Sequence, residues 1–210
     1  MLLKKNYIIV GLTAYHHEFL RISVPAVARL KQKVFLVIYN DNPDINITKS
    51  QITDLGYRGP VHIINTHQNV GTLKSKLEIV DHITQSNIKS DWMVFVNESD
   101  ILMDVDIPNV TSQNYAVLLN KAIINDRPLD LIRAMDDPHK YIEQNHTKIV
   151  HPYGDINGAF IRTNIITDMD KTNIIDNNSL LAGLGAHART IYADAAPIYM
   201  DRINYIAIEQ

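Results

Sequence analysis

Four clusters of polar residues each follow directly on a short apolar run, and several of their side chains are of types that bind nucleotides. The clusters cover residues 13–17, 40–44, 65–71 and 97–100. The aromatic face of Tyr15 could stack on a base, and the carboxylate of Asp41 could accept a hydrogen bond from a base or a ribose hydroxyl. Glu98 and Asp100 are two residues apart, so on an extended backbone both carboxylates point to one side. There they could bind a divalent cation that holds a diphosphate.

The apolar runs that precede these clusters predict buried strands. They cover residues 7–12, 34–39, 61–64 and 92–96. The runs are rich in β-branched and aromatic residues and do not alternate with polar ones, which is typical of parallel strands covered on both faces. In open α/β sheets, ligands bind beyond the carboxyl ends of the strands. We therefore expect the four polar clusters to meet at one edge of a sheet.

Segments between the runs are long enough for helical crossovers. The clearest covers residues 72–83, where Leu73, Leu77 and Val80 share one helix face. Residues 18–31 also have helical spacing but contain Pro25, which predicts a kink or two short helices. A weaker helix is expected over 45–55. This alternation predicts an α/β fold with a Rossmann-like, doubly wound, mostly parallel sheet.

The rhythm changes after residue 106, and the second half of the chain predicts a more mixed arrangement. We expect a helix over 115–124 and strands over 129–132, 158–162 and 190–192. The whole is interpreted as one domain, 1–210, with a nucleotide-binding half, 1–106, and a second half, 107–210.

Composition excludes several classes of function. The chain has 210 residues, no Cys and a net charge of -3. It therefore has no disulfide, thiolate nucleophile or Cys-based metal site, and it is not a strongly basic nucleic-acid binder. The G-x-G-x-x-G and G-x-x-x-x-G-K-[ST] fingerprints are absent. With no apolar run of about 18 residues and no apolar leader, the expected protein is cytoplasmic and does not insert stably into a membrane.

Six short motifs, taken in their order, carry a resemblance to a known family. They lie at residues 12–15, 40–42, 69–71, 95–102, 157–164 and 197–202. In this order they resemble the GT-A glycosyltransferases, and in particular family 2. Leu12-Thr13-Ala14-Tyr15 stands where that family has P-T-Y-N, and Lys76 falls where it usually has an Arg. The line around Glu98 and Asp100 stands in place of the D-x-D metal motif, with Asn97 and Ser99 replacing two of the usual acids.

The resemblance implies a glycosyltransferase, hexosyl or pentosyl, that uses a nucleoside-diphosphate sugar, UDP-type in the first instance, with Mn²⁺ or Mg²⁺. Residues 107–210 would then bind the acceptor and carry the catalytic base. The implied donor-binding residues are Thr13, Tyr15, Asp41, Lys76 and Glu98. The implied metal ligands are Asp100, Glu98 and a late histidine, His187. The implied general base is Asp176, with Asp155 as the alternative.

Each of these residues also has a structural interpretation. Asp41 could form a turn, since Asn-Asp-Asn-Pro favours one, and Asp176 could cap a helix that contains Leu180. Lys76 could lie on a solvated helix face and His187 on the surface. Arg162 and Arg202 are expected to be structural ion-pair partners.

Other functions stay open on the sequence. The main alternative is a catalytically silent module that binds a nucleotide or a glycan on the same fold. A sugar-1-phosphate nucleotidyltransferase would need a Gly-rich, basic loop after the first strand, and residues 13–17 do not supply one. The acceptor would be a surface glycan or lipopolysaccharide or, as a variant, a hydroxymethylated base in viral DNA.

Overall fold

The computed structural model describes residues 7–104, 106–107, 111, 113–124, 137–144, 148–150 and 156–208. The strands are β1 (Tyr7–Ala14), β2 (Lys33–Asn40), β3 (Val61–Asn65), β4 (Trp92–Asn97), β5 (Ile101–Leu102), β6 (Asn114–Ile124), β7 (Lys148–Val150), β8 (Phe160–Arg162) and β9 (Ala196–Ile208). The helices are the 3-10 turn η1 (His17–Phe19), α1 (Leu20–Ala28), α2 (Lys49–Asp54), α3 (Thr72–Gln85), α5 (Pro138–Gln144), α6 (Thr163–Asp168) and α7 (Asn177–Ile191). Among these residues the strands form one sheet in the order β3-β2-β1-β4-β8-β6-β9-β5, with β7 paired to β6.

The first half of the sheet is parallel, as predicted. β1 lies between β2 and β4, and β3 pairs with the far side of β2. Their registers place Ala14 opposite Asn40, Asn40 opposite Asn65 and Thr13 opposite Asn97. The carboxyl ends of all four strands are therefore level, and the polar residues that follow them share one edge.

The helices between these strands follow the sequence pattern, with two differences in detail. α1 contains Pro25 within a single helix, and the irregular turn precedes it as η1. α2 begins at Lys49 and not at residue 45, because Thr48 caps it. The Thr48 hydroxyl accepts from Gln51 N at 3.3 Å, and Gln51 Oε1 accepts from Thr48 N at 2.7 Å. This reciprocal cap fixes the start of the helix.

Two predictions for the second half are wrong. Residues 115–124 belong to strand β6, because Leu118 and Leu119 are buried on opposite faces of the sheet and β6 pairs along its length with β9. Successive side chains on opposite faces are the geometry of a strand and not of a helix. Residues 190–191 are the last turn of α7, whose buried residues Leu180, Leu184 and Ala188 repeat at helical spacing. The predicted strand over 158–162 is confirmed as β8, and that over 129–132 lies outside the described residues.

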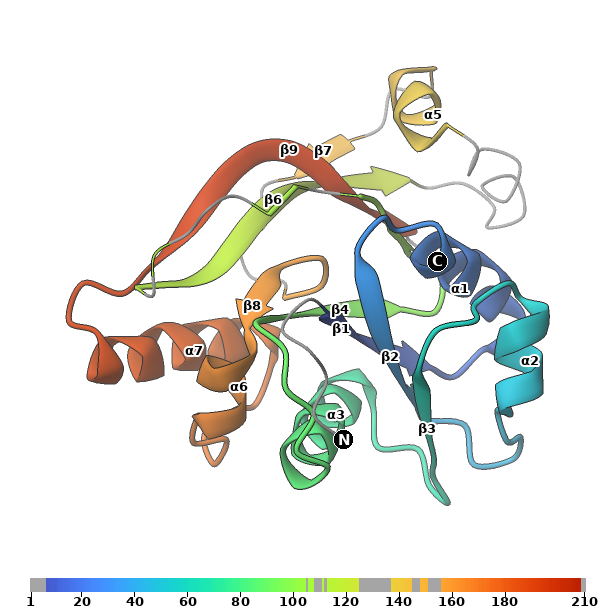
Figure 1. Ribbon diagram of the computed structural model, residues 1–210, viewed down its shortest axis with the longest axis horizontal. Helices are drawn as coiled ribbons and strands as arrows, with labels where there is room; N and C mark the ends of the chain where they lie inside the picture. Colours follow the sequence, from blue (N-terminus) through green and yellow to red (C-terminus); the bar gives the residue numbers. More distant parts are fainter. Residues whose placement is uncertain are drawn as a thin grey trace.

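Helices cover both faces of the sheet (Figure 1). α3, α6 and α7 pack on one face through a cluster that includes Ile79, Ile165 and Leu184. α1 and α2 pack on the other through Val24 and Ile52. β6 and β9 form a long curved pair above α7, with β7 and α5 beyond them. The predicted α/β fold with a mostly parallel sheet is confirmed.

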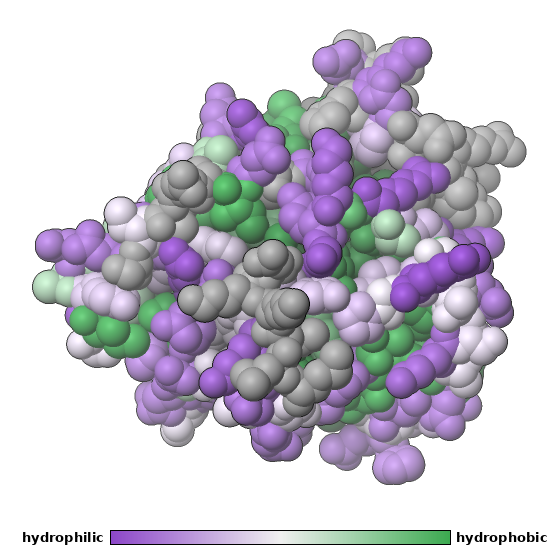
Figure 2. Space-filling model, in the orientation of Figure 1, coloured by the Kyte–Doolittle hydropathy of each residue, from purple (hydrophilic) through white to green (hydrophobic). Residues whose placement is uncertain are grey.

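The surface in the same view is predominantly hydrophilic, with hydrophobic side chains gathered in smaller patches between polar ones (Figure 2). Within the described ranges, none of the helices has both the length and the apolar character needed to cross a membrane.

Candidate active site

A cavity of about 290 Å³ lies at the carboxyl ends of β1, β2 and β4. It is lined by Thr13, Ala14, Tyr15, Asp41, Thr72, Ser75, Asn97, Glu98 and Ser99. Four of the five predicted donor-binding residues, Thr13, Tyr15, Asp41 and Glu98, are therefore brought together. Level strand ends account for this convergence, because each of these residues lies at the end of a parallel strand or just beyond it.

The end of β1 supplies a hydroxyl and an aromatic ring. Thr13 Oγ1 donates to Asn97 Oδ1 at 3.2 Å, which links β1 to β4. The side chain of Tyr15 is 38% exposed, and the edge of its ring meets the ring of His16 with the centroids 4.9 Å apart. The backbone carbonyl of Tyr15 accepts from Asn42 Nδ2 at 3.0 Å, which fixes the backbone at the start of this loop.

Asp41 is a clamp on the loop that precedes α3. Its side chain is buried, Oδ1 accepts from Val70 N at 2.6 Å, and Oδ2 accepts from Gly71 N at 2.9 Å. Gly71 has φ +83°, a backbone conformation that favours glycine, which explains the glycine of the N-x-G motif. Each carboxylate oxygen keeps further lone-pair capacity for a ligand hydroxyl or imino group.

Asn40 holds the loops together below the cavity. It is fully buried, and its Nδ2 donates to Asn65 Oδ1 at 2.9 Å and to Ile45 O at 2.6 Å. Its Oδ1 accepts from Asn42 N at 3.1 Å and lies 2.8 Å from His17 Nε2. This one amide ties the segments after β1, β2 and β3 to each other.

The two acids of the motif after β4 diverge. Glu98 faces the cavity, and its Oε1 accepts from His16 N at 3.2 Å. Burial raises the pKa of Glu98, and the hydrogen bonds from backbone N–H groups oppose that shift. Asp100 does not line the cavity. It is buried, and its Oδ2 accepts from Tyr205 Oη at 2.6 Å and from Asn97 Nδ2 at 3.0 Å.

The tie to Tyr205 connects the end of β4 to the last strand. Tyr205 Oη also accepts from Asn97 N at 3.2 Å. Gly158 lets the Tyr205 ring approach, because a Cβ at this position would lie 2.7 Å from the ring. Asp100 therefore takes part in a buried hydrogen-bonded group that joins the two halves of the sheet.

The described residues do not fit the metal site that the resemblance implies. Nowhere in the described part of the chain do three His, Asp or Glu side chains come close enough together to hold an ion. Glu98 faces the cavity while the Asp100 carboxylate is engaged by Tyr205 and Asn97. His187 lies on α7, and its Nε2 is buried without a hydrogen-bond partner among the described residues. We therefore derive no chemical step through a metal.

Two further predicted residues, Lys76 and Asp176, lie near the start of α7. Lys76 is fully buried on α3, and its Nζ donates to Asn177 Oδ1 at 3.2 Å. Asp176 is exposed and is the N-cap of α7, where its carboxylate accepts from Ser179 N at 2.6 Å. Hydrogen bonds from the backbone and the side chain of Ser179 lower the pKa of Asp176. Asp155 lies outside the described residues.

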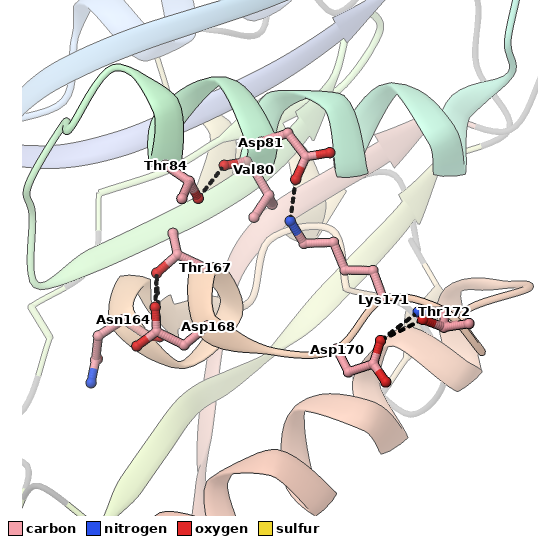
Figure 3. Close-up of polar contacts among 9 residues, drawn as sticks. All are labelled: Val80, Asp81, Thr84, Asn164, Thr167, Asp168, Asp170, Lys171 and Thr172. Carbon is pink, nitrogen blue, oxygen red and sulfur yellow. Dashed lines mark hydrogen bonds and ion pairs between the residues drawn. The ribbon is translucent and has the colours of Figure 1, made fainter.

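The start of α7 is held against α3 by an ion pair as well. Lys171, in the segment before α7, reaches across to Asp81 on α3 (Figure 3). Together with the bond between Lys76 and Asn177, this contact fixes α7 relative to the helix whose first turn lines the cavity. Lys76 therefore positions α7 and does not line the cavity in this conformation.

Arg162 and Arg202 lie away from the cavity. The Arg162 guanidinium stacks over the Trp92 ring, 4.3 Å from its centroid, and donates to the carbonyls of Asn114 and Thr111. Arg202 lines a separate cavity of about 510 Å³ beside Asp104 and Asp201.

Sequence reasoning missed Thr72, Ser75 and Tyr205. Thr72 and Ser75 belong to the first turn of α3, directly after Gly71, so the predicted helix start carried a signal for them. Tyr205 carried no local signal, since its hydroxyl meets residues more than a hundred positions earlier in the chain.

Comparisons with known proteins support the fold. No protein-family model matches the chain, and no curated protein matches it in sequence. Among solved structures, residues 1–349 of S. aureus TarS match with a TM-score of 0.58 and 14% identity, over 96% of this chain and 60% of that one. A second structure of S. aureus TarS matches with a TM-score of 0.56 and 13% identity, over 97% of this chain and 37% of that one.

A mannosyltransferase, PcManGT from Pyrobaculum calidifontis in complex with GDP-Man and Mn²⁺, matches with a TM-score of 0.53 and 6% identity, over 96% of this chain and 56% of that one. The chain thus spans less than two thirds of each of these proteins. Identities this low show the fold alone, which is the Rossmann-like glycosyltransferase fold.

Proposed function

We propose that this chain is a glycosyltransferase that binds a nucleoside-diphosphate sugar, UDP-type in the first instance, in the cavity at the strand ends. The observation that carries the proposal is the convergence of Thr13, Tyr15, Asp41 and Glu98 on one cavity from β1, β2 and β4. The fold shared with a mannosyltransferase solved with GDP-Man supports it. The acceptor is a hydroxyl, and a surface glycan is the first candidate.

Different residues around the cavity bind the base, the ribose and the phosphates of the donor. The accessible face of Tyr15 stacks on the base. Asp41 accepts from a base or ribose donor with its remaining lone pairs, while Val70 and Gly71 hold it in place. The hydroxyls of Thr13, Thr72 and Ser75 donate to phosphate or sugar oxygens.

Glu98 faces the charged part of the donor. Burial raises the pKa of Glu98, so a proton is held on this carboxyl more readily than on an exposed one. A protonated Glu98 would donate a hydrogen bond to a diphosphate oxygen, and an ionised Glu98 would instead accept one from a sugar hydroxyl.

The proposal does not include a bound divalent metal, and experiment should test whether one is needed. A resident Mn²⁺ or Mg²⁺ would offset the charge of the leaving diphosphate. The described residues, however, bring no three ligating side chains together. Nucleotide binding should therefore be measured with Mn²⁺ and with EDTA.

The first experiment is a thermal-shift screen with UDP, GDP, CDP and dTDP, each with Mn²⁺ and with EDTA. A nucleotide at a hundredfold excess over its dissociation constant should stabilise the fold by about 2.7 kcal/mol. Tyr15→Ala should weaken binding by about 1–3 kcal/mol, the usual contribution of base stacking. Tyr199→Ala, which removes a 54% exposed tyrosine of β9 outside the cavity lining, should leave binding unchanged. No shift with any of the four nucleotides would overturn the proposal.

A second candidate is a catalytically silent module that binds a nucleotide sugar without transferring the sugar. The engagement of Asp100 by Tyr205 and Asn97 favours it, because this carboxylate is turned away from the cavity. Incubation with UDP-hexoses and UDP-pentoses, followed by detection of free UDP, separates the two functions. A silent module binds the donor but releases no UDP.

A further inference from the structure

Two histidines face each other at the end of the molecule opposite the cavity. His62 is the second residue of β3, and His82 lies near the end of α3. His62 Nδ1 and His82 Nε2 are 2.9 Å apart, and their ring centroids are separated by 5.2 Å. The cavity, in contrast, lies at the carboxyl ends of the strands, so this pair belongs to no part of the proposed donor site.

The backbone and two neighbours hold the imidazoles in this arrangement. His62 pairs in register with Val37, which directs it to the face of the sheet that α3 covers. The edge of the His62 ring packs on Phe35 with centroids 5.1 Å apart. Ser86 Oγ lies 3.4 Å from His82 Nε2. The two nitrogens are hydrogen-bonded, so one imidazole donates to the other and the pair joins β3 to α3.

Both rings can be reached from solvent, since His62 is exposed and His82 is half-buried. Neutral imidazole is the form that ligates metals.

We propose that His62 and His82 form a bidentate site for a divalent transition metal that prefers imidazole, with Zn²⁺ as the reference ion. With Zn–N bonds of about 2.0–2.1 Å, two nitrogens of a tetrahedral shell are about 3.3 Å apart. The metal would replace the proton that the two nitrogens share. Their 2.9 Å separation would open by about 0.4 Å, and both rings would turn so that each lone pair points to the ion. Water completes the shell, because the described residues place no third His, Asp or Glu there.

The metal would link β3 to α3, which are connected in sequence by the loop over 66–71. One end of this connected segment is already held by Asp41, which binds Val70 N and Gly71 N. The metal would join the other end, where β3 is the edge strand of the sheet and pairs only with β2 among the described strands. It would therefore stabilise the fold next to the cavity without taking part in chemistry there.

The test is a calorimetric titration of the nucleotide-free full chain with Zn²⁺ alone. His62→Gln and His82→Gln should each abolish Zn²⁺ binding at this site or lower its affinity about tenfold or more. Loss of a residue that only hydrogen-bonds to a metal ligand already lowers metal affinity by that much. His67→Gln, which removes an exposed histidine two residues after β3, is the matched control and should bind as the wild type does. Zn²⁺ should raise the melting temperature of the wild type and of the control, but not of the other two variants.

A second measurement uses the wild type alone, so that it does not depend on how the variants fold. Diethyl pyrocarbonate modifies accessible imidazoles, and the modified residues are read by mass spectrometry. Zn²⁺ should protect His62 and His82 and leave His67 unprotected. Equal Zn²⁺ binding by all four proteins, or equal modification of the three histidines with and without Zn²⁺, would overturn the proposal and indicate adventitious binding elsewhere. Neither result depends on whether the cavity binds a nucleotide.

Discussion

The two halves of the sheet use their polar residues in different ways. In the parallel half, side chains after β1, β2 and β4 converge on a cavity and keep accessible groups, of which Tyr15 and Glu98 are examples. The candidate catalytic and metal-binding residues instead form part of the framework, since Asp176 in the mixed half caps α7, and Asp100, directly after β4, is bound by Tyr205 from β9 of the mixed half. Parallel strands bring their carboxyl ends to one edge whatever follows them, and mixed pairing imposes no such rule.

The largest effect should come from Asp41, because it serves both the fold and the cavity. Asp41→Ala removes the acceptor of Val70 N and one of the two acceptors of Gly71 N, the other being Asn69 Oδ1. The change should cost about 2 kcal/mol or more of unfolding free energy. Nucleotide binding should be lost in the same variant. Urea unfolding and the thermal-shift assay measure the two effects.

The control for this change is Asp44→Asn in the same loop. Asp44 is exposed, so its replacement should alter stability by no more than about 0.5 kcal/mol. If Asp41→Ala is as stable as that control, the hydrogen bonds from Val70 N and Gly71 N to Asp41 do not contribute to the stability of the fold.

The next prediction concerns the bond between Asp100 and Tyr205. Tyr205→Phe removes a donor from the buried Asp100 carboxylate, and Asp100→Asn replaces this charged acceptor by a neutral amide oxygen. Each change should cost about 1–3 kcal/mol. A double-mutant cycle from urea unfolding should give a coupling energy of about 0.5–3 kcal/mol.

The same pair of variants separates a framework role for Asp100 from metal binding. A framework role predicts that Mn²⁺ changes nucleotide affinity equally in both variants. If Asp100 binds the metal, Asp100→Asn alone should abolish the effect of Mn²⁺, and the contrast between the two halves would then be wrong at this residue.

The parts of the molecule that sequence predicted are those governed by local rules. Continuous apolar runs predicted β1 to β4, and helical spacing predicted α3, so the shared location of four cavity-lining residues, Thr13, Tyr15, Asp41 and Glu98, could be predicted from the sequence. β6 was mistaken for a helix, because an apolar segment of this length fits a buried strand or a buried helix and only the pairing with β9 decides between them. The group around Asp100 could not be predicted, because its partner Tyr205 comes from the far end of the chain.

A smaller effect is expected at Glu98. Burial raises the pKa of Glu98 above 4.5, so the folded protein binds this proton more tightly than the unfolded chain does. The stability that the proton contributes is complete below about pH 4.5 and is lost as the pH rises through the folded-state pKa. Glu98→Gln cannot ionise and its carbonyl can still accept from His16 N, so it should be more resistant to urea than the wild type at neutral pH.

The difference between Glu98→Gln and the wild type should narrow as the pH falls toward 4.5. Glu18→Gln, at an exposed position in η1 outside the cavity lining, is the control and should show no such pH-dependent difference. A stability gain that is the same at every pH would mean that the carboxyl of Glu98 does not titrate differently in the folded protein.

The smallest effect should come from Asp176→Asn, which distinguishes the capping role from that of a general base. Asn caps helices as well as Asp does, so the start of α7 should be kept and stability should hardly change. The lowered pKa of Asp176 makes it a weak proton acceptor, and we expect UDP release from a donor to continue near the wild-type rate. A fall of about 10²–10⁴-fold with unchanged stability would identify Asp176 as the base. Asp176→Ala, which removes the cap, should be less stable than Asp176→Asn, so the two variants together show which of the two roles the carboxylate has.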